Sequence, residues 1–273
     1  MKYGKTKIVV CETERELGKR AAHDVAACMR ELPRGRDEIR MVFAAGESQN
    51  AFLAALAGEP ELDWQRVVCF NMDDFWKPGM PERFTCGYQT RTQLYEKVAP
   101  KRFHVIRYNA PDPQAEARRF SELLREAGAI DILCQGIGTS GHLALNEPGA
   151  ATFDDAEPVR VVELAEQSKR QLRDDPNFAG LGYIPDKGIT MTIPALLRAR
   201  HVFTMVPLAL KREILTRLMQ YTEPSPELPA TILLRTPSVL YLDRDSCPEI
   251  VNQVIDSGPT STGNSTSSRR LMT

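Results

Sequence analysis

Short apolar runs alternate with helical segments along most of this chain, and this alternation restricts its fold more than any other feature. The runs predicted to be strands span residues 7–10, 39–45, 66–72, 103–108, 130–135, 159–164, 188–193, 201–206 and 239–243. The main predicted helices between them span residues 13–32, 49–57, 88–98 and 112–127. Because crossovers between parallel strands are right-handed, such units build a parallel or mixed sheet. We therefore predict a Rossmann-like, doubly wound α/β fold, with a mostly parallel sheet and helices on both faces.

The chain is long enough for one large domain. Its 273 residues are 42% hydrophobic and 26% charged, which suits a globular protein with a full-sized core. The sequence contains no internal repeat and no sign of a second core, so we predict a single domain over residues 1–256. We expect the charged segment around residues 150–187 to be a lid over a site, and the Ser/Thr-rich residues 257–273 to be a disordered tail.

Charge, hydropathy and cysteine usage predict a cytoplasmic protein with a small-molecule partner. The net charge is −1, with acidic and basic residues interspersed, so no basic face for nucleic acid or for a membrane surface is expected. No apolar run approaches the ~20 residues that span a bilayer, and the first residues lack the apolar core of a signal peptide. The six cysteines are scattered without a C-x-x-C pair, which predicts reduced core thiols and no metal site.

The segment over residues 130–148 reads I-D-I-L-C-Q-G-I-G-T-S-G-H-L-A-L-N-E-P. Gly136, Gly138 and Gly141 match G-x-G-x-x-G, but N-E-P-G ends any helix within two turns, which excludes a dinucleotide site. We expect these glycines to let the backbone pass close to a ligand, or to expose N–H groups to an anion or to sugar hydroxyls. His142 and Glu147 form a candidate acid/base pair. A purely structural histidine is the alternative.

A candidate anion site follows the predicted strand at residues 39–45. Gly46, Glu47 and Ser48 stand there at the start of a helix, where free N–H groups and the helix dipole favour a phosphate. The alternative is that Ser48 only caps the helix. Lys211 lies near the start of a later predicted helix, where a cation opposes the dipole. An anionic ligand explains this lysine better than stability does.

Two adjacent carboxylates, Asp73 and Asp74, follow the predicted strand at residues 66–72. Such residues are commonly helix caps or solvated loop charges. In open α/β sheets, however, ligands bind beyond the carboxyl ends of the strands. Polar groups suited to one ligand follow several of the predicted strands, so we expect them to converge on one site.

Three motifs carry a resemblance to the glucosamine-6-phosphate deaminase/isomerase family, which is more distantly related to 6-phosphogluconolactonases. They are F-N-M-D-D at residues 70–74, N-A-P-D at residues 109–112 and G-x-G-x-x-G-H-x-A-x-N-E-P at residues 136–148. The resemblance covers about residues 7–243. It implies the deaminase/isomerase type of α/β fold and an aldose-to-ketose isomerisation of an amino-sugar phosphate with loss of ammonia. It implies no metal or organic cofactor, and it is the sole reason to expect a homo-oligomer.

The resemblance also implies roles for individual residues. Asp73 matches the base that moves a proton between C2 and C1, His142 the group that assists ring opening, and Glu147 its carboxylate partner. Gly46 to Ser48 and Lys211 match phosphate-binding positions, and Arg160 is aligned with a further one.

Two positions depart from the family pattern. Ser140 stands where the family usually has an acidic residue or Asn, and we place it beside His142 and Glu147 in the catalytic group. The residues after Asp73 also differ from the usual continuation. These departures leave galactosamine 6-phosphate open as a substrate beside glucosamine 6-phosphate. The alternatives to a deaminase are a lactonase that acts on a sugar phosphate, and a non-catalytic sugar-phosphate sensor.

Overall fold

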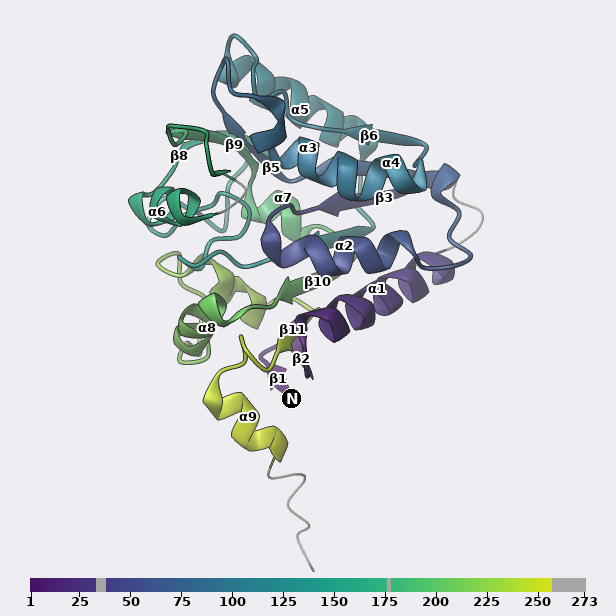
Figure 1. The fold of residues 1–273 in the computed structure, drawn as a ribbon, viewed down its shortest axis with the longest axis vertical. Helices are drawn as coiled ribbons and strands as arrows, with labels where there is room; N and C mark the ends of the chain where they lie inside the picture. The colour runs from purple at the N-terminus through teal and green to yellow at the C-terminus, as the bar shows by residue number, and fades with distance from the viewer. Residues whose placement is uncertain (33–37, 176–177, 257–273) are drawn as a thin grey trace, which may run out of the picture.

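The computed structural model describes residues 1–32, 38–175 and 178–256, and the predicted tail at 257–273 lies outside the described residues. Its centre is an eight-stranded sheet with the order β1-β2-β11-β10-β7-β3-β4-β6 (Figure 1). The strands are β1 (Lys2–Tyr3), β2 (Thr6–Cys11), β11 (Ser238–Asp243), β10 (His201–Val206), β7 (Ile132–Gln135), β3 (Ile39–Phe43), β4 (Val67–Asn71) and β6 (Arg102–His104). All neighbours are parallel except β1 and β2. The predicted sheet is therefore confirmed.

Helices cover both faces of this sheet (Figure 1). They are α1 (Glu14–Glu31), α2 (Asn50–Ala57), α3 (Cys86–Thr90), α4 (Glu96–Val98), α5 (Pro113–Ala127), α6 (Glu166–Asp174), α7 (Ile193–Leu197), α8 (Arg212–Leu218) and α9 (Glu249–Asp256). Successive strand residues point to opposite faces. Met41 and Phe43 of β3 thus pack with residues of α1 and α2, whereas Val42 packs with residues of α5 and α7. This alternation confirms the doubly wound architecture.

Shorter turns of helix lie between these elements. They are η1 (Glu47–Gln49), η2 (Trp64–Arg66), η3 (Glu82–Phe84), η6 (Ala209–Lys211) and η7 (Pro229–Leu234), and η4 (Arg91–Tyr95) is a π-helix between α3 and α4. The predicted helix at residues 88–98 therefore begins two residues earlier and contains a π turn. Such turns are rare and occur often at functional sites.

A second, three-stranded sheet stands beside the main one. It consists of β5 (Asp73–Trp76), β9 (Lys187–Met191) and β8 (Val159–Glu163), all antiparallel. The predicted strands at residues 159–164 and 188–193 are confirmed as strands, and both belong to this small sheet. Since β5 starts two residues after β4 ends, Asp73 begins an antiparallel strand instead of a loop.

The segment predicted as a lid contains β8 and α6. Leu164 and Leu172 from this segment pack in one buried cluster with Phe75 of β5 and Phe84 of η3. The segment therefore packs against the loop between β5 and α3. A lid over the carboxyl ends of the strands would have to lie on this side of the main sheet. Its action as a lid stays a prediction.

No disulfide bond joins two cysteines within the described part of the chain. Four cysteines are buried, as expected for core thiols: Cys28, Cys69, Cys134 and Cys247. The other two, Cys11 and Cys86, are partly exposed. Among the helices of the described residues, none has the length and apolar character needed to cross a bilayer.

Candidate active site

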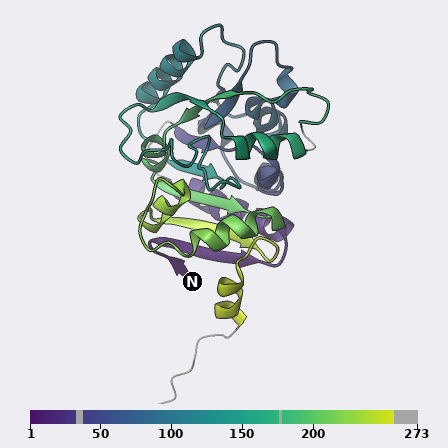
Figure 2. The ribbon, with the colours of Figure 1, turned by 90° about the vertical axis from the view of Figure 1, so that its left-hand side faces the viewer.

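A cavity of about 310 Å³ opens beyond the carboxyl ends of β3, β7 and β10. It lies on the side of the sheet where α6 and α8 are seen in Figure 1, and Figure 2 faces that side. The sequence-predicted residues that line it are Gly46, Glu47, Ser48, Asp73, Gly136, Gly138, His142 and Lys211. The structure thus brings the predicted strand ends together at one site. The other walls come from α3, η4 and α6, which supply Tyr88, Gln89, Thr92, Gln93, Ser168 and Gln171.

His142 lines this cavity with buried polar groups behind it. Its Nδ1 lies 2.8 Å from Ser140 Oγ and 3.2 Å from Glu147 Oε2. Ser140 and Glu147 are each only 3% exposed. Neither lines the cavity, and both contact His142, which does. Because Nδ1 faces a carboxylate, we assign the neutral ring a proton on Nδ1, which leaves Nε2 as a base.

Glu147 is held as a carboxylate. Burial by itself raises its pKa, but the charge and hydrogen bond of His142 and the hydroxyls of Ser168 and Ser140 outweigh burial, so the net pKa is lowered. Both serine hydroxyls donate to it, Ser140 to Oε2 at 2.8 Å and Ser168 to Oε1. Ser168 was missed by the sequence reasoning, since nothing in the local pattern of α6 singles out one hydroxyl.

The glycines of the segment after β7 have close protein neighbours, while the expected approach of a ligand to them stays a prediction. A Cβ on Gly138 would lie 1.9 Å from His142 Nε2, and a Cβ on Gly136 would lie 2.9 Å from Gln49 Nε2. The N–H of Gly138 donates to the carbonyl of His142 at 3.0 Å. Protein groups therefore fill the space beside these glycines, and Gly138 in particular makes room for the imidazole.

Asp73 and Asp74 have different environments. The carboxylate of Asp74 is fully buried and accepts the N–H groups of Phe75, Cys86 and Gly87 at 2.8 to 3.0 Å. Burial nevertheless raises its pKa to about 8, although these N–H bonds act to lower it. Asp74 thus holds the first turn of α3, which is the helix-cap role considered as an alternative for this pair.

Asp73 faces the cavity. Burial raises its pKa to about 6, and the nearby His142 acts to lower it. Within the described residues, no donor makes a hydrogen bond to its carboxylate. A desolvated carboxylate without donors is more basic than usual and free to contact a ligand.

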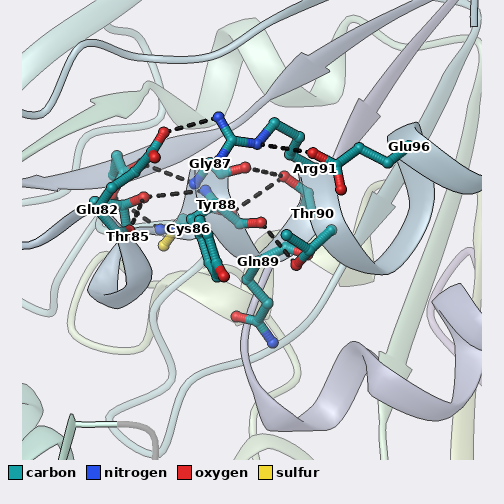
Figure 3. Close-up of polar contacts among 11 residues, drawn as sticks. Glu82, Thr85, Cys86, Gly87, Tyr88, Gln89, Thr90, Arg91 and Glu96 are labelled. Atoms are coloured by element: carbon teal, nitrogen blue, oxygen red, sulfur yellow. Dashed lines mark hydrogen bonds and ion pairs between the residues drawn. The ribbon is translucent and has the colours of Figure 1, made fainter. Parts of the chain in front are cut away.

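Residues of α3 and η4 line one wall of the cavity, and Figure 3 shows the polar contacts around them. Thr85 caps α3 by accepting the N–H of Tyr88 at 3.0 Å. Arg91 pairs with Glu82 at 2.8 Å, and in Figure 3 Gln89 points away from that pair. Its side chain accepts the N–H of Gly46 at 2.8 Å. Gln89 was also missed from the sequence, because this contact joins segments 43 residues apart.

The candidate anion site lies around Gly46 and Lys211, which both line the cavity. Gly46 has φ +102°, a backbone conformation that favours glycine, and it leads into η1. Lys211 is buried, and desolvation lowers its pKa to about 8, whereas Glu47 acts to raise it. Leu208, three residues before the lysine, has the strained φ of +82° and donates its N–H to Asp243 at 3.1 Å. A buried ammonium beside a helix start favours an anionic ligand.

Arg160 stands apart from this site. Its side chain is about half exposed, pairs with Asp155, and is not among the residues that line the cavity. It lies on β8, at the edge of the small sheet. The structure therefore does not bring Arg160 to the cavity, and its role in phosphate binding stays a prediction of the resemblance.

The chain matches known proteins over most of its length. A profile of the family described as glucosamine-6-phosphate isomerases/6-phosphogluconolactonase matches residues 12–241. A glucosamine-6-phosphate deaminase from Exiguobacterium sp. strain AT1b is 34% identical over 180 residues, which cover 65% of this chain and 67% of that protein. Glucosamine-6-phosphate deaminase 1 from Bacillus subtilis is 25% identical over 245 residues, 88% of this chain and 98% of that protein.

Solved structures share the fold. A monomeric glucosamine-6-phosphate deaminase aligns with a TM-score of 0.76 and 23% identity, covering 88% of this chain and 98% of its own. A 6-phosphogluconolactonase from Thermotoga maritima aligns with a TM-score of 0.68 and 18% identity, covering 87% and 99%. The match to the family profile includes every segment that lines the cavity. This chain is therefore a member of the glucosamine-6-phosphate isomerase/6-phosphogluconolactonase family.

Proposed function

We propose that this protein is a hexosamine-6-phosphate deaminase, an enzyme that converts glucosamine 6-phosphate or galactosamine 6-phosphate into a ketohexose 6-phosphate and ammonia. The observation that carries the proposal is Asp73, a donor-free carboxylate with a raised pKa that faces the same cavity as His142 and Lys211. The relatives that match over most of their length bear the name of this activity.

The geometry suits ring opening followed by isomerisation. His142, oriented by Glu147 and Ser140, would take the proton of O1 and supply one to O5 of the closed sugar. Asp73 would then take the proton of C2 and return it to C1, while O1 gains the proton that the amine nitrogen loses, which gives a 2-imine with a hydroxyl on C1. Water hydrolyses this imine to the ketose phosphate and ammonia, so one water is consumed for each ammonia released.

The substrate phosphate would bind at the other end of the cavity. The N–H groups at the start of η1, the hydroxyl of Ser48 and the ammonium of Lys211 would hold it, since Gly46, Ser48 and Lys211 all line the cavity. A lactonase needs an activated water but no group that shuttles a proton between two carbons, so Asp73 favours the deaminase. A cytoplasmic location stays an expectation from composition and hydropathy, and a homo-oligomeric state stays an expectation from the family resemblance.

A substrate panel tests the proposal. Ammonia and ketose formation are measured with glucosamine 6-phosphate, galactosamine 6-phosphate and the unphosphorylated amino sugars, beside hydrolysis of 6-phosphogluconolactone. We expect ammonia release from at least one hexosamine phosphate and little from the free sugars. Lactone hydrolysis alone would make the protein a lactonase. Binding that raises the melting temperature without any turnover would identify a sensor.

A further inference from the structure

Ser168 connects α6 to the group behind His142. Its side chain is 5% exposed, and its hydroxyl donates to Glu147 Oε1 from 21 residues along the chain. The same Oγ lies 3.4 Å from His142 Nδ1, a longer and weaker contact. The carboxylate is therefore its main partner.

With the hydrogen bond from Ser168, both oxygens of the Glu147 carboxylate have a hydroxyl donor. Oε2 of this carboxylate accepts the hydroxyl of Ser140 and faces His142 Nδ1, while Oε1 accepts the hydroxyl of Ser168. With donors on both oxygens, the plane of the carboxylate is set. If the donor on Oε1 is removed, the carboxylate is free to rotate and its alignment with Nδ1 is lost.

Other contacts dock α6 on the same loop without touching Glu147. Gln167 Nε2 donates to the carbonyl of Thr139 at 3.1 Å, and Thr139 Oγ1 donates to Gln171 Oε1 at 2.6 Å. The hydroxyl of Ser168 thus donates to the carboxylate of Glu147, whereas the hydroxyl of Thr139 donates to Gln171 of α6. This pair makes it possible to separate the two effects.

We propose that Ser168 is a positioning residue, which fixes Glu147 and through it keeps the proton of His142 on Nδ1 and Nε2 free toward the cavity. The inference deepens the proposed function and rests on it for its kinetic part. It assigns to α6 a direct part in preparing the ring-opening base. Together, Ser168 and Ser140 supply the two hydroxyl donors that hold the carboxylate of Glu147.

Kinetics give the first test. Replacing Ser168→Ala is expected to lower kcat about 10-fold or more with a much smaller change in KM, since a hydrogen bond to a charged group is lost and the candidate anion site is untouched. Ser168→Thr, which keeps a hydroxyl, is expected to retain most of the activity. Thr139→Val is the matched control at the same interface. If Thr139→Val lowers kcat as much as Ser168→Ala, docking of α6 explains the effect and the positioning role is wrong.

Proton NMR of the imidazole gives a test that does not depend on activity. The Nδ1–H of His142, assigned with His142→Asn, is expected as a low-field resonance in the wild type and in Thr139→Val, and is expected to broaden or move upfield in Ser168→Ala. An unchanged resonance in Ser168→Ala would overturn the inference. If the wild type releases no ammonia, the proposed function fails, and the NMR comparison still decides the role of Ser168.

Discussion

Replacing Asp73→Asn is expected to stabilise the folded protein at pH 8 while it removes activity. Burial raises the pKa of this carboxyl from its ordinary value of 3.8 to about 6. A pKa that is higher in the folded state means that stability is intact below pH 3.8 and declines as the pH rises through 6. Since each tenfold change in proton affinity is worth about 1.4 kcal/mol, ionised Asp73 destabilises the fold by up to about 3 kcal/mol at pH 8. An amide at this position does not ionise.

Two measurements check this reasoning. Urea unfolding of wild type and Asp73→Asn is compared at pH 8 and near pH 4, and the gain in unfolding free energy is expected at pH 8 and not near pH 4. Ammonia release is expected to fall at least about 100-fold, the scale for loss of a positioned general base. A variant no more stable than wild type at pH 8 would refute the desolvation of Asp73. An unchanged turnover would exclude Asp73 as the base.

Asp74→Asn is the matched control for this prediction. The Asp74 carboxylate accepts the backbone N–H groups of Phe75, Cys86 and Gly87. In Asp74→Asn, the NH₂ group of the amide replaces one of the two accepting oxygens and faces an N–H donor. Near pH 4, where the folded protein holds Asp74 protonated and its raised pKa has little effect on stability, we expect a loss of about 1–3 kcal/mol of unfolding free energy, the scale for an unpaired buried polar group. A loss for Asp74→Asn at a pH at which Asp73→Asn has no effect would separate a helix cap from a base facing a cavity.

The remaining predictions concern the candidate anion site and the backbone around the cavity. Lys211→Ala is expected to raise KM more than it lowers kcat. In the wild type, KM is expected to rise above about pH 8, because the ammonium with a pKa of about 8 loses its proton there; a flat KM up to pH 9.5 would argue against it. Gly138→Ala is expected to displace His142, whose Nε2 lies 1.9 Å from the added Cβ, and to abolish turnover with an unchanged circular dichroism spectrum. Leu208→Gly is expected to raise stability by about 1 kcal/mol in thermal unfolding, because relief of about 1–3 kcal/mol of strain exceeds the entropic disadvantage of glycine. A lower melting temperature would show that packing of the leucine side chain dominates.

Local signals in the sequence were sufficient for the fold and for the centre of the site. Apolar runs followed by turns and helices predict parallel strands because the period and length of a run are properties of contiguous residues. The positions of Asp73, His142 and Lys211 follow from the same signals, since ligands in such sheets bind beyond the carboxyl ends of the strands. The structure brings these residues to one cavity.

Tertiary structure decided what each group does there. Asp73 and Asp74 are adjacent and chemically identical, and only the N–H groups of α3 make one of them a cap and leave the other free. Gly138 is required by the imidazole that packs over it, and Ser168 and Gln89 reach the site from other segments. These contacts depend on how elements distant in the sequence pack together. The residues around a hydroxyl or an amide in the sequence do not predict its hydrogen-bond partner. The sequence by itself therefore determined which residues gather at the cavity, and packing determined which donors hold them in place.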